Sequence, residues 1–144
     1  MSTEENKALA RREIEGIFNA KGNSDAAAEE IYAPDYISHQ PAGDEELRGP
    51  EAIKQFAAGL RRAFPDLQMT IEDQIAEVDK VVTRLTSRGS HRGELWGIAP
   101  TGREVEVGSV STNRIGGGKI VEHWTCADRL GMMQQLGVIE PQPG

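Results

Sequence analysis

Near its C-terminal end the chain reads Lys119-Ile-Val-Glu-His-Trp-Thr-Cys-Ala-Asp128 and continues as Arg129-Leu-Gly-Met-Met-Gln-Gln-Leu-Gly137. The first part is rich in β-branched and aromatic residues, which favour a strand. Asp128 is a residue type that commonly begins a helix, and Gly137 is the type that ends one. The stretch therefore predicts a strand that runs into a short helix. It places a carboxylate at the junction, beside an indole and an imidazole, where it could transfer protons.

The composition bounds the class of protein. With 144 residues the chain is long enough for one buried core and too short for two, so we expect residues 1–144 to form a single domain. The hydrophobic share is 38%, and no apolar run approaches the roughly 18 residues that a membrane-spanning helix needs. The first residues are acidic and polar, unlike a signal peptide. We expect a soluble, cytoplasmic protein with no membrane partner.

Charge and cysteine content exclude further classes. The formal net charge is -7 and the arginines are scattered along the chain, so a nucleic-acid partner is not expected. The single cysteine, Cys126, excludes an internal disulfide. We expect Cys126 to be a small buried hydrophobe.

Apolar spacing predicts three helices in the first half of the chain, over residues 4–21, 25–32 and 50–64. Pro34 ends the second helix and Pro65 the third, because the residue before a proline is disfavoured in helical conformation. A turn is expected after the second helix. Phe56 and Leu60 lie on one apolar stripe of the third helix.

From Leu67 onward the hydrophobic period changes to two, as in strands. Long strands are predicted from Leu67 and over residues 80–92, 103–115 and 119–127, with a bulge near Gln74 and Ile75. The three glycines at 116–118 indicate a tight turn between the last two strands. Together the elements predict an α+β fold with a long, curved, mainly antiparallel sheet and a short C-terminal helix.

Several motifs in this order resemble one family. They are Arg48-Gly49-Pro50-Glu51, Gly89-Ser-His91-Arg-Gly93, Gly97-Ile-Ala-Pro100-Thr101-Gly102, and Gly118-Lys-Ile-Val-Glu122-His-Trp124 continuing to Gln135-Leu-Gly137. The chain resembles the SnoaL-like polyketide cyclases from about Leu9 to Gly137. The resemblance implies the NTF2-like cone, in which three N-terminal helices pack against the curved sheet and leave a deep, mainly apolar pocket. The same cone also hosts other activities, so the resemblance does not fix the substrate.

The resemblance also implies a chemistry. Members of this family close a ring by an intramolecular aldol reaction, without a metal or an organic cofactor. The acid/base aspartate of the family falls on Asp128. Burial beside Trp124 would raise the pKa of this carboxyl group towards the range that a base needs. The alternative is that Asp128 only caps the helix that follows, and the resemblance favours the catalytic role.

Histidines supply the other candidates for chemistry. His39 lies where the family commonly places a pocket histidine that could hold a substrate oxygen, and its alternative is a surface-loop position. His123 is one residue out of phase with Glu122, Trp124 and Asp128, so we expect it on the opposite face of the strand and rank it below His39. The histidines have no close partners at ligand spacing, so no metal site is predicted.

The remaining candidates would bind substrate. Trp124, Phe56 and Leu60 are expected to form flat or apolar walls. Glu122 shares the strand face of Trp124. Arg84 is charged in the middle of a strand, which either places it on the solvent face or lets it pair with Asp128, Glu122 or an anionic part of a ligand.

We therefore expect a cofactor-independent, polyketide cyclase-like enzyme that acts on a small hydrophobic substrate with carbonyl groups. One alternative is a non-catalytic protein that binds a small hydrophobic ligand in the same cone. Another is a hydroxylase-type relative of the same family. The resemblance further implies a homo-oligomer, a dimer or tetramer, and the strand around Val105 and Val107 is the candidate contact.

Overall fold

The structure is a computed structural model that describes residues 2–19, 24–39 and 46–140. Its elements in chain order are α1 (Thr3–Glu13), the π-helix η1 (Ile14–Phe18), α2 (Ser24–Ile31), β1 (Tyr32–His39), β2 (Leu47–Arg48), α3 (Gly49–Ala63), β3 (Gln68–Glu77), β4 (Lys80–Ser90), β5 (Glu104–Gly116), β6 (Lys119–Ala127) and α4 (Arg129–Leu136). Within the described residues no helix is long and apolar enough to cross a membrane.

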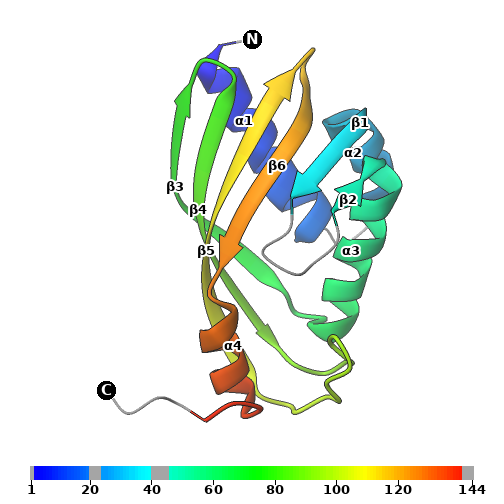
Figure 1. Ribbon diagram of the computed structural model, residues 1–144, viewed down its shortest axis with the longest axis vertical. Helices are drawn as coiled ribbons and strands as arrows, with labels where there is room; N and C mark the ends of the chain where they lie inside the picture. Colours follow the sequence, from blue (N-terminus) through cyan, green and yellow to red (C-terminus); the bar gives the residue numbers. More distant parts are fainter. Residues whose placement is uncertain (1, 20–23, 40–45, 141–144) are drawn as a thin grey trace.

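The described strands form one six-stranded sheet in the order β2-β1-β6-β5-β4-β3. Neighbouring strands are antiparallel except β1 and β6, which are parallel. The long strands bend along their length, α1 contacts β3 and β4, α3 lies along β1 and β2, and α4 contacts β5 at the lower end (Figure 1). The expected α+β architecture with a mainly antiparallel sheet and a short C-terminal helix is confirmed.

The first predicted helix changes its hydrogen-bonding pattern in the middle. Ser2 and Glu5 form a reciprocal capping box at the start of α1, which satisfies two of the free N–H groups there. After Glu13 the chain continues as η1, in which Asn19 N donates to Ile14 O at 3.0 Å. The Asn19 side chain then bonds both backbone groups of Met69 on β3. The predicted end of this helix, at Lys21, lies outside the described residues.

The predicted helix 25–32 is one residue too long, and the turn after it is wrong. Tyr32 begins β1, and β2 follows, so only two of the three predicted helical segments precede the first strand. The sequence did not predict β1, because Pro34 cannot donate a hydrogen bond to a neighbouring strand and so argues against a strand at this position. The β1–β6 register shifts between Tyr32 and Ile37, at the part of the strand that contains Pro34.

The predicted bulge in the third strand exists but lies earlier. The β3–β4 register shifts between Ile71 and Asp73, rather than at Gln74 and Ile75. This shift lets Met69 and Ile71 pack against the main core together with Ala76, although the spacing from Ile71 to Ala76 is odd.

Two buried clusters share the interior. The larger one joins α1, η1, α2 and α3 to the sheet, and the smaller one joins the end of α3 to β5 and α4. Val105 and Val107 belong to the smaller cluster and are buried. The expectation that they form an oligomer contact is therefore wrong, because in this sheet they face inward.

Candidate active site

A cavity of about 180 Å³ lies between the helices and the inner face of the sheet. Its walls are mostly apolar and come from α3, β4, β5 and α4; they include Phe56, Leu60, Phe64, Leu85, Val107 and Met132. Such a site suits a hydrophobic ligand, with few polar groups to orient it. Phe56 and Leu60, predicted as substrate walls, both line this cavity.

Polar side chains line the cavity from β4 and α4 and from three further elements. Glu13 lies at the end of α1, Ser109 and Ser111 lie on β5, and His123 and Thr125 lie on β6. In β6 the inward residues are therefore His123, Thr125 and Ala127, two apart, as a strand requires. The expectation that His123 faces away from the pocket is wrong, because Glu122 and Trp124 occupy the outer face.

A buried chain of hydrogen bonds lies behind His123. Tyr32 Oη donates to Glu13 Oε2 at 2.6 Å, Asn113 Nδ2 donates to Glu13 Oε1 at 3.0 Å, and His123 Nδ1 lies 2.5 Å from Asn113 Oδ1. Glu13 is only 2% exposed. Burial lowers the pKa of His123 below its ordinary value, while the negative charge of Glu13 acts in the opposite direction. This shift favours the neutral form of the imidazole.

The structure places Asp128 at the start of α4, where its side chain accepts a hydrogen bond from Gly131 N at 2.9 Å. Asp128 is exposed and is not among the residues that line the cavity. The expected burial beside Trp124 is absent. The geometry of this carboxylate is that of a helix N-cap.

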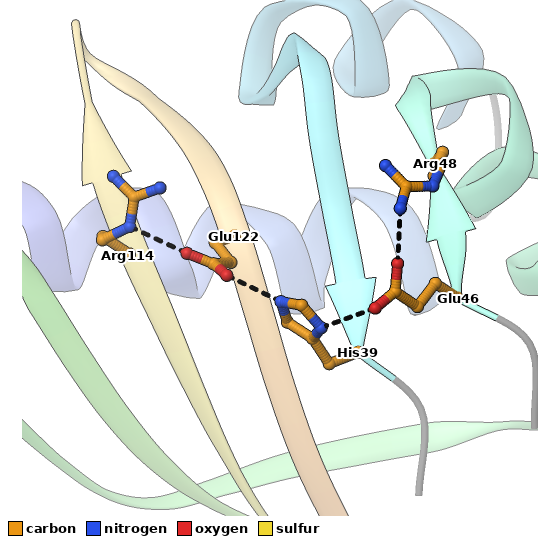
Figure 2. Close-up of polar contacts among 5 residues, drawn as sticks. All are labelled: His39, Glu46, Arg48, Arg114 and Glu122. Carbon is orange, nitrogen blue, oxygen red and sulfur yellow. Dashed lines mark hydrogen bonds and ion pairs between the residues drawn. The ribbon is translucent and has the colours of Figure 1, made fainter. Parts of the chain in front are cut away.

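His39 belongs to a cluster of charged residues on the other face of the sheet (Figure 2). Its Nε2 lies 2.6 Å from Glu122 Oε2, its Nδ1 lies 3.2 Å from Glu46 Oε1, and Arg114 Nε donates to Glu122 Oε1 at 3.0 Å. Arg48 continues the chain to Glu46. The hydrogen bond from His39, followed by the contacts of Arg114, lowers the pKa of Glu122.

The other predicted binding residues also lie outside the cavity. The Trp124 ring stacks on His39 with the ring centroids 5.2 Å apart. Arg84 is exposed on β4, between the inward residues Thr83 and Leu85. Cys126 is exposed, so the prediction of a small buried hydrophobe is wrong. Of the predicted site residues, the structure brings only Phe56, Leu60 and His123 to the cavity.

A loop over residues 91–103 brings Trp96 to the rim of the cavity. His91 holds the loop, because its Nδ1 accepts a hydrogen bond from Thr101 N at 3.2 Å. The Arg129 guanidinium lies 4.8 Å from the centroid of the Trp96 ring, within the range of a cation–π contact. Trp96 and Arg129 thus add an aromatic and a cationic side chain to the lining of the cavity.

Two site residues were missed from the sequence. Glu13 stands four residues from both Leu9 and Ile17, which places an acid on the apolar stripe of the first helix. Asn113 interrupts the inward face of a strand. A polar residue on a buried face is the signal that could have found both. Among the described residues no group of His, Cys, Asp and Glu side chains could hold a metal ion.

Comparisons with known proteins agree on one family. A sequence model of the SnoaL-like polyketide cyclases matches residues 8–136. The chain is 35% identical over 140 residues to the aklanonic acid methyl ester cyclase DnrD of Streptomyces peucetius, covering 94% of this chain and 92% of DnrD. AclR of Streptomyces galilaeus, a proposed hydroxylase, matches with a TM-score of 0.83 at 29% identity, over 99% of this chain and 87% of AclR. A SnoaL-like structure from a Jannaschia species matches in fold, with a TM-score of 0.87 at 24% identity. The match covers 97% of this chain and 95% of the Jannaschia chain.

Proposed function

The chain belongs to the SnoaL-like polyketide cyclase family, and from this membership we propose that it closes a ring in a hydrophobic, carbonyl-rich substrate by an intramolecular aldol addition. A base removes a proton from a carbon that neighbouring carbonyl groups acidify. The resulting carbanion attacks a carbonyl carbon of the same molecule and forms the new C–C bond. The alkoxide then takes up the proton, so the product has the mass of the substrate.

The observation that carries this proposal is the imidazole of His123 in the wall of a mostly apolar cavity. His123 lines the cavity and its pKa is lowered by burial, so it can accept a proton at pH 7 and return it to the alkoxide. The apolar walls support binding of a folded hydrophobic chain, and the rim accommodates polar ends. Proximity of the two reacting carbons supplies much of the rate, since both belong to one bound molecule.

Asp128 is the competing candidate for proton transfer. It has the family resemblance in its favour, but its carboxylate is exposed, caps α4 and does not line the cavity. The geometry supports His123, because its ring lines the cavity and Asp128 does not. A matched pair of variants separates the two candidates.

The test uses a polyketide methyl ester of the kind that the name of DnrD describes. His123→Asn keeps an N–H donor near the position of Nδ1 and removes Nε2, whereas Asp128→Asn keeps a good helix cap and removes the acid/base function. We expect the unaltered protein to give a product of unchanged mass and new retention time. We expect His123→Asn to be slower by about 100-fold or more and Asp128→Asn to retain most of the activity. If Asp128→Asn lost the activity and His123→Asn kept it, proton transfer would be assigned to Asp128.

The similarity to AclR favours a second candidate function. AclR is a proposed hydroxylase and matches this chain at 29% identity. Hydroxylation would add the mass of one oxygen atom and would require molecular oxygen and a reductant. Mass spectrometry of the same reaction, run with and without a reductant in air, therefore distinguishes the two activities.

We also propose a homodimer that forms through the outer face of the sheet. Ile75, Val82, Val110 and Trp124 are exposed there, and strand register places Ile75 opposite Val82 and Trp124 opposite Thr112. These side chains form a band across four strands, which we call the outer band. Exposed apolar side chains that gather on one face of a sheet are typical of an interface between copies.

A further inference from the structure

We propose that Glu13, acting through Asn113, sets the tautomer of His123 and thereby makes Nε2 the nitrogen that takes the substrate proton. Glu13 and Asn113 would be positioning residues, since they act through His123. The inference rests on the proposed function, in which His123 is the base. It concerns which nitrogen is basic, and this can be measured without substrate.

The first step concerns the orientation of Asn113. A carboxylate can only accept hydrogen bonds, and Glu13 faces Tyr32 Oη at 2.6 Å and the Asn113 amide at 3.0 Å. Burial and the charge of Glu13 raise the pKa of Tyr32 well above its ordinary value, so its hydroxyl stays protonated and donates. Asn113 therefore presents its NH₂ group to the remaining carboxylate oxygen.

The second step transfers this orientation to the imidazole. With its NH₂ group towards Glu13, Asn113 turns Oδ1 towards His123 Nδ1, at 2.5 Å. An amide oxygen accepts and cannot donate, so Nδ1 carries the proton. In a neutral imidazole only one nitrogen is protonated. Nε2 is therefore the nitrogen with the free lone pair.

This assignment has a chemical consequence. A neutral imidazole in water favours the opposite tautomer, with the proton on Nε2. Without Glu13 and Asn113, His123 would therefore be mainly in the tautomer that has its proton on Nε2, in which Nε2 cannot accept the substrate proton. An aspartate or an amide that fixes a histidine tautomer has the same role in other acid/base sites.

The local backbone supports a functional role for Glu13. The π-helix η1 begins at the next residue, and Ile14 and Phe18 of η1 line the same cavity. π-Helical turns are rare and occur frequently at functional sites. Burying a carboxylate is also unfavourable unless donors satisfy it, and Glu13 has two.

Glu13→Gln tests the direction of the chain of hydrogen bonds. This change replaces one carboxylate oxygen with an NH₂ group of the same shape. If Tyr32 keeps donating to the remaining oxygen, the new NH₂ group faces Asn113, whose amide turns to accept it. Asn113 then presents its own NH₂ group to His123 Nδ1, and the ring proton moves to Nε2.

The measurement is ¹⁵N NMR of the imidazole nitrogens in histidine-labelled protein, at about pH 8, where an ordinary imidazole is neutral. His123→Asn identifies the His123 signals among the three histidines. In the unaltered protein we expect a protonated Nδ1 and an unprotonated Nε2. Glu13→Gln should shift His123 towards the Nε2-protonated form and lower kcat by about 100-fold, with little change in KM.

Two further variants control the experiment. Glu15→Gln makes the same chemical change at an exposed position two residues away and should leave tautomer and kcat unaltered. Tyr32→Phe removes one donor but leaves the Glu13–Asn113 bond, so Nδ1 should stay protonated. An Nε2-protonated His123 in the unaltered protein would overturn the inference, and so would an unchanged tautomer in Glu13→Gln. Failure of the cyclase assay with the expected NMR result would instead overturn the proposed function alone.

Discussion

At the scale of single residues, burial decides which groups can carry chemistry. His123 and Asp128 are five positions apart, an odd number, so a continuous strand would place them on opposite faces. The inner face is that of His123, where desolvation lowers the pKa of the ring. Asp128 instead follows the last residue of β6 and caps α4 in contact with solvent. The family resemblance alone could not distinguish these two environments.

The lowered pKa of His123 predicts the pH dependence of the reaction. The base is active when unprotonated, so kcat/KM should rise with pH, reach half its maximum below pH 6.5, the ordinary value for histidine, and then stay level. The unfolded chain binds this proton more readily, so the free energy of unfolding should also decrease as the pH falls below 6.5. A pH–rate profile in buffers of constant ionic strength checks the first expectation.

The same profile separates the candidates for the base. A midpoint above 6.5 would contradict the lowered pKa of His123. His123→Asn is the control, and its residual activity should not show the midpoint assigned to His123.

At the scale of elements, the loop over residues 91–103 depends on a close contact with α3. Arg92 N and Gly93 N both donate to Ala63 O, at 2.9 and 3.1 Å, which satisfies a carbonyl at the end of the helix. The contact is close because Gly93 has no side chain. A Cβ at this position would lie 2.1 Å from Arg62 O. This anchor fixes the start of the loop that carries Trp96 to the rim of the cavity.

Gly93→Ala should therefore destabilise the protein by about 1–3 kcal/mol, because the backbone must move to relieve the overlap. Urea unfolding followed by circular dichroism measures the change. Gly108→Ala is the matched control, since a Cβ on Gly108 in β5 meets no atom within 4 Å, and its free energy of unfolding should stay the same or increase. Equal stability of the two variants would contradict the role of Gly93.

At the scale of the whole molecule, the two faces of the sheet differ in what they contact. The inner face and the helices enclose the cavity, and the outer face carries the outer band and the His39 cluster. Ile75 is 64% exposed and Trp124 is 37% exposed, which is unfavourable for large apolar side chains in water. A second copy of the chain would cover both.

Substitution in the outer band should weaken the proposed dimer. We expect Val110→Glu to raise the dissociation constant at least tenfold, about 1.4 kcal/mol or more, because the interface would bury a charge. Sedimentation velocity over a range of concentrations measures this change. Val138→Glu places the same charge on an exposed apolar residue after α4 and should leave the dimer intact. A monomeric unaltered protein at high concentration would refute the dimer.

The sequence by itself determined the family, the α+β class, the α3 stripe that carries Phe56 and Leu60, and the strand-to-helix junction at Asp128. These features follow from local periodicity, capping and glycine positions, which act between neighbours in the chain. Only the tertiary structure decided that β1 exists despite Pro34 and that His123 faces the cavity. The hydrogen bond between Glu13 and Asn113, which are 100 residues apart in the chain, was likewise visible only in the tertiary structure. Which face of a strand is buried depends on what packs against it, and in β6 both faces carry polar and apolar residues, so the alternation in this strand did not identify the buried face.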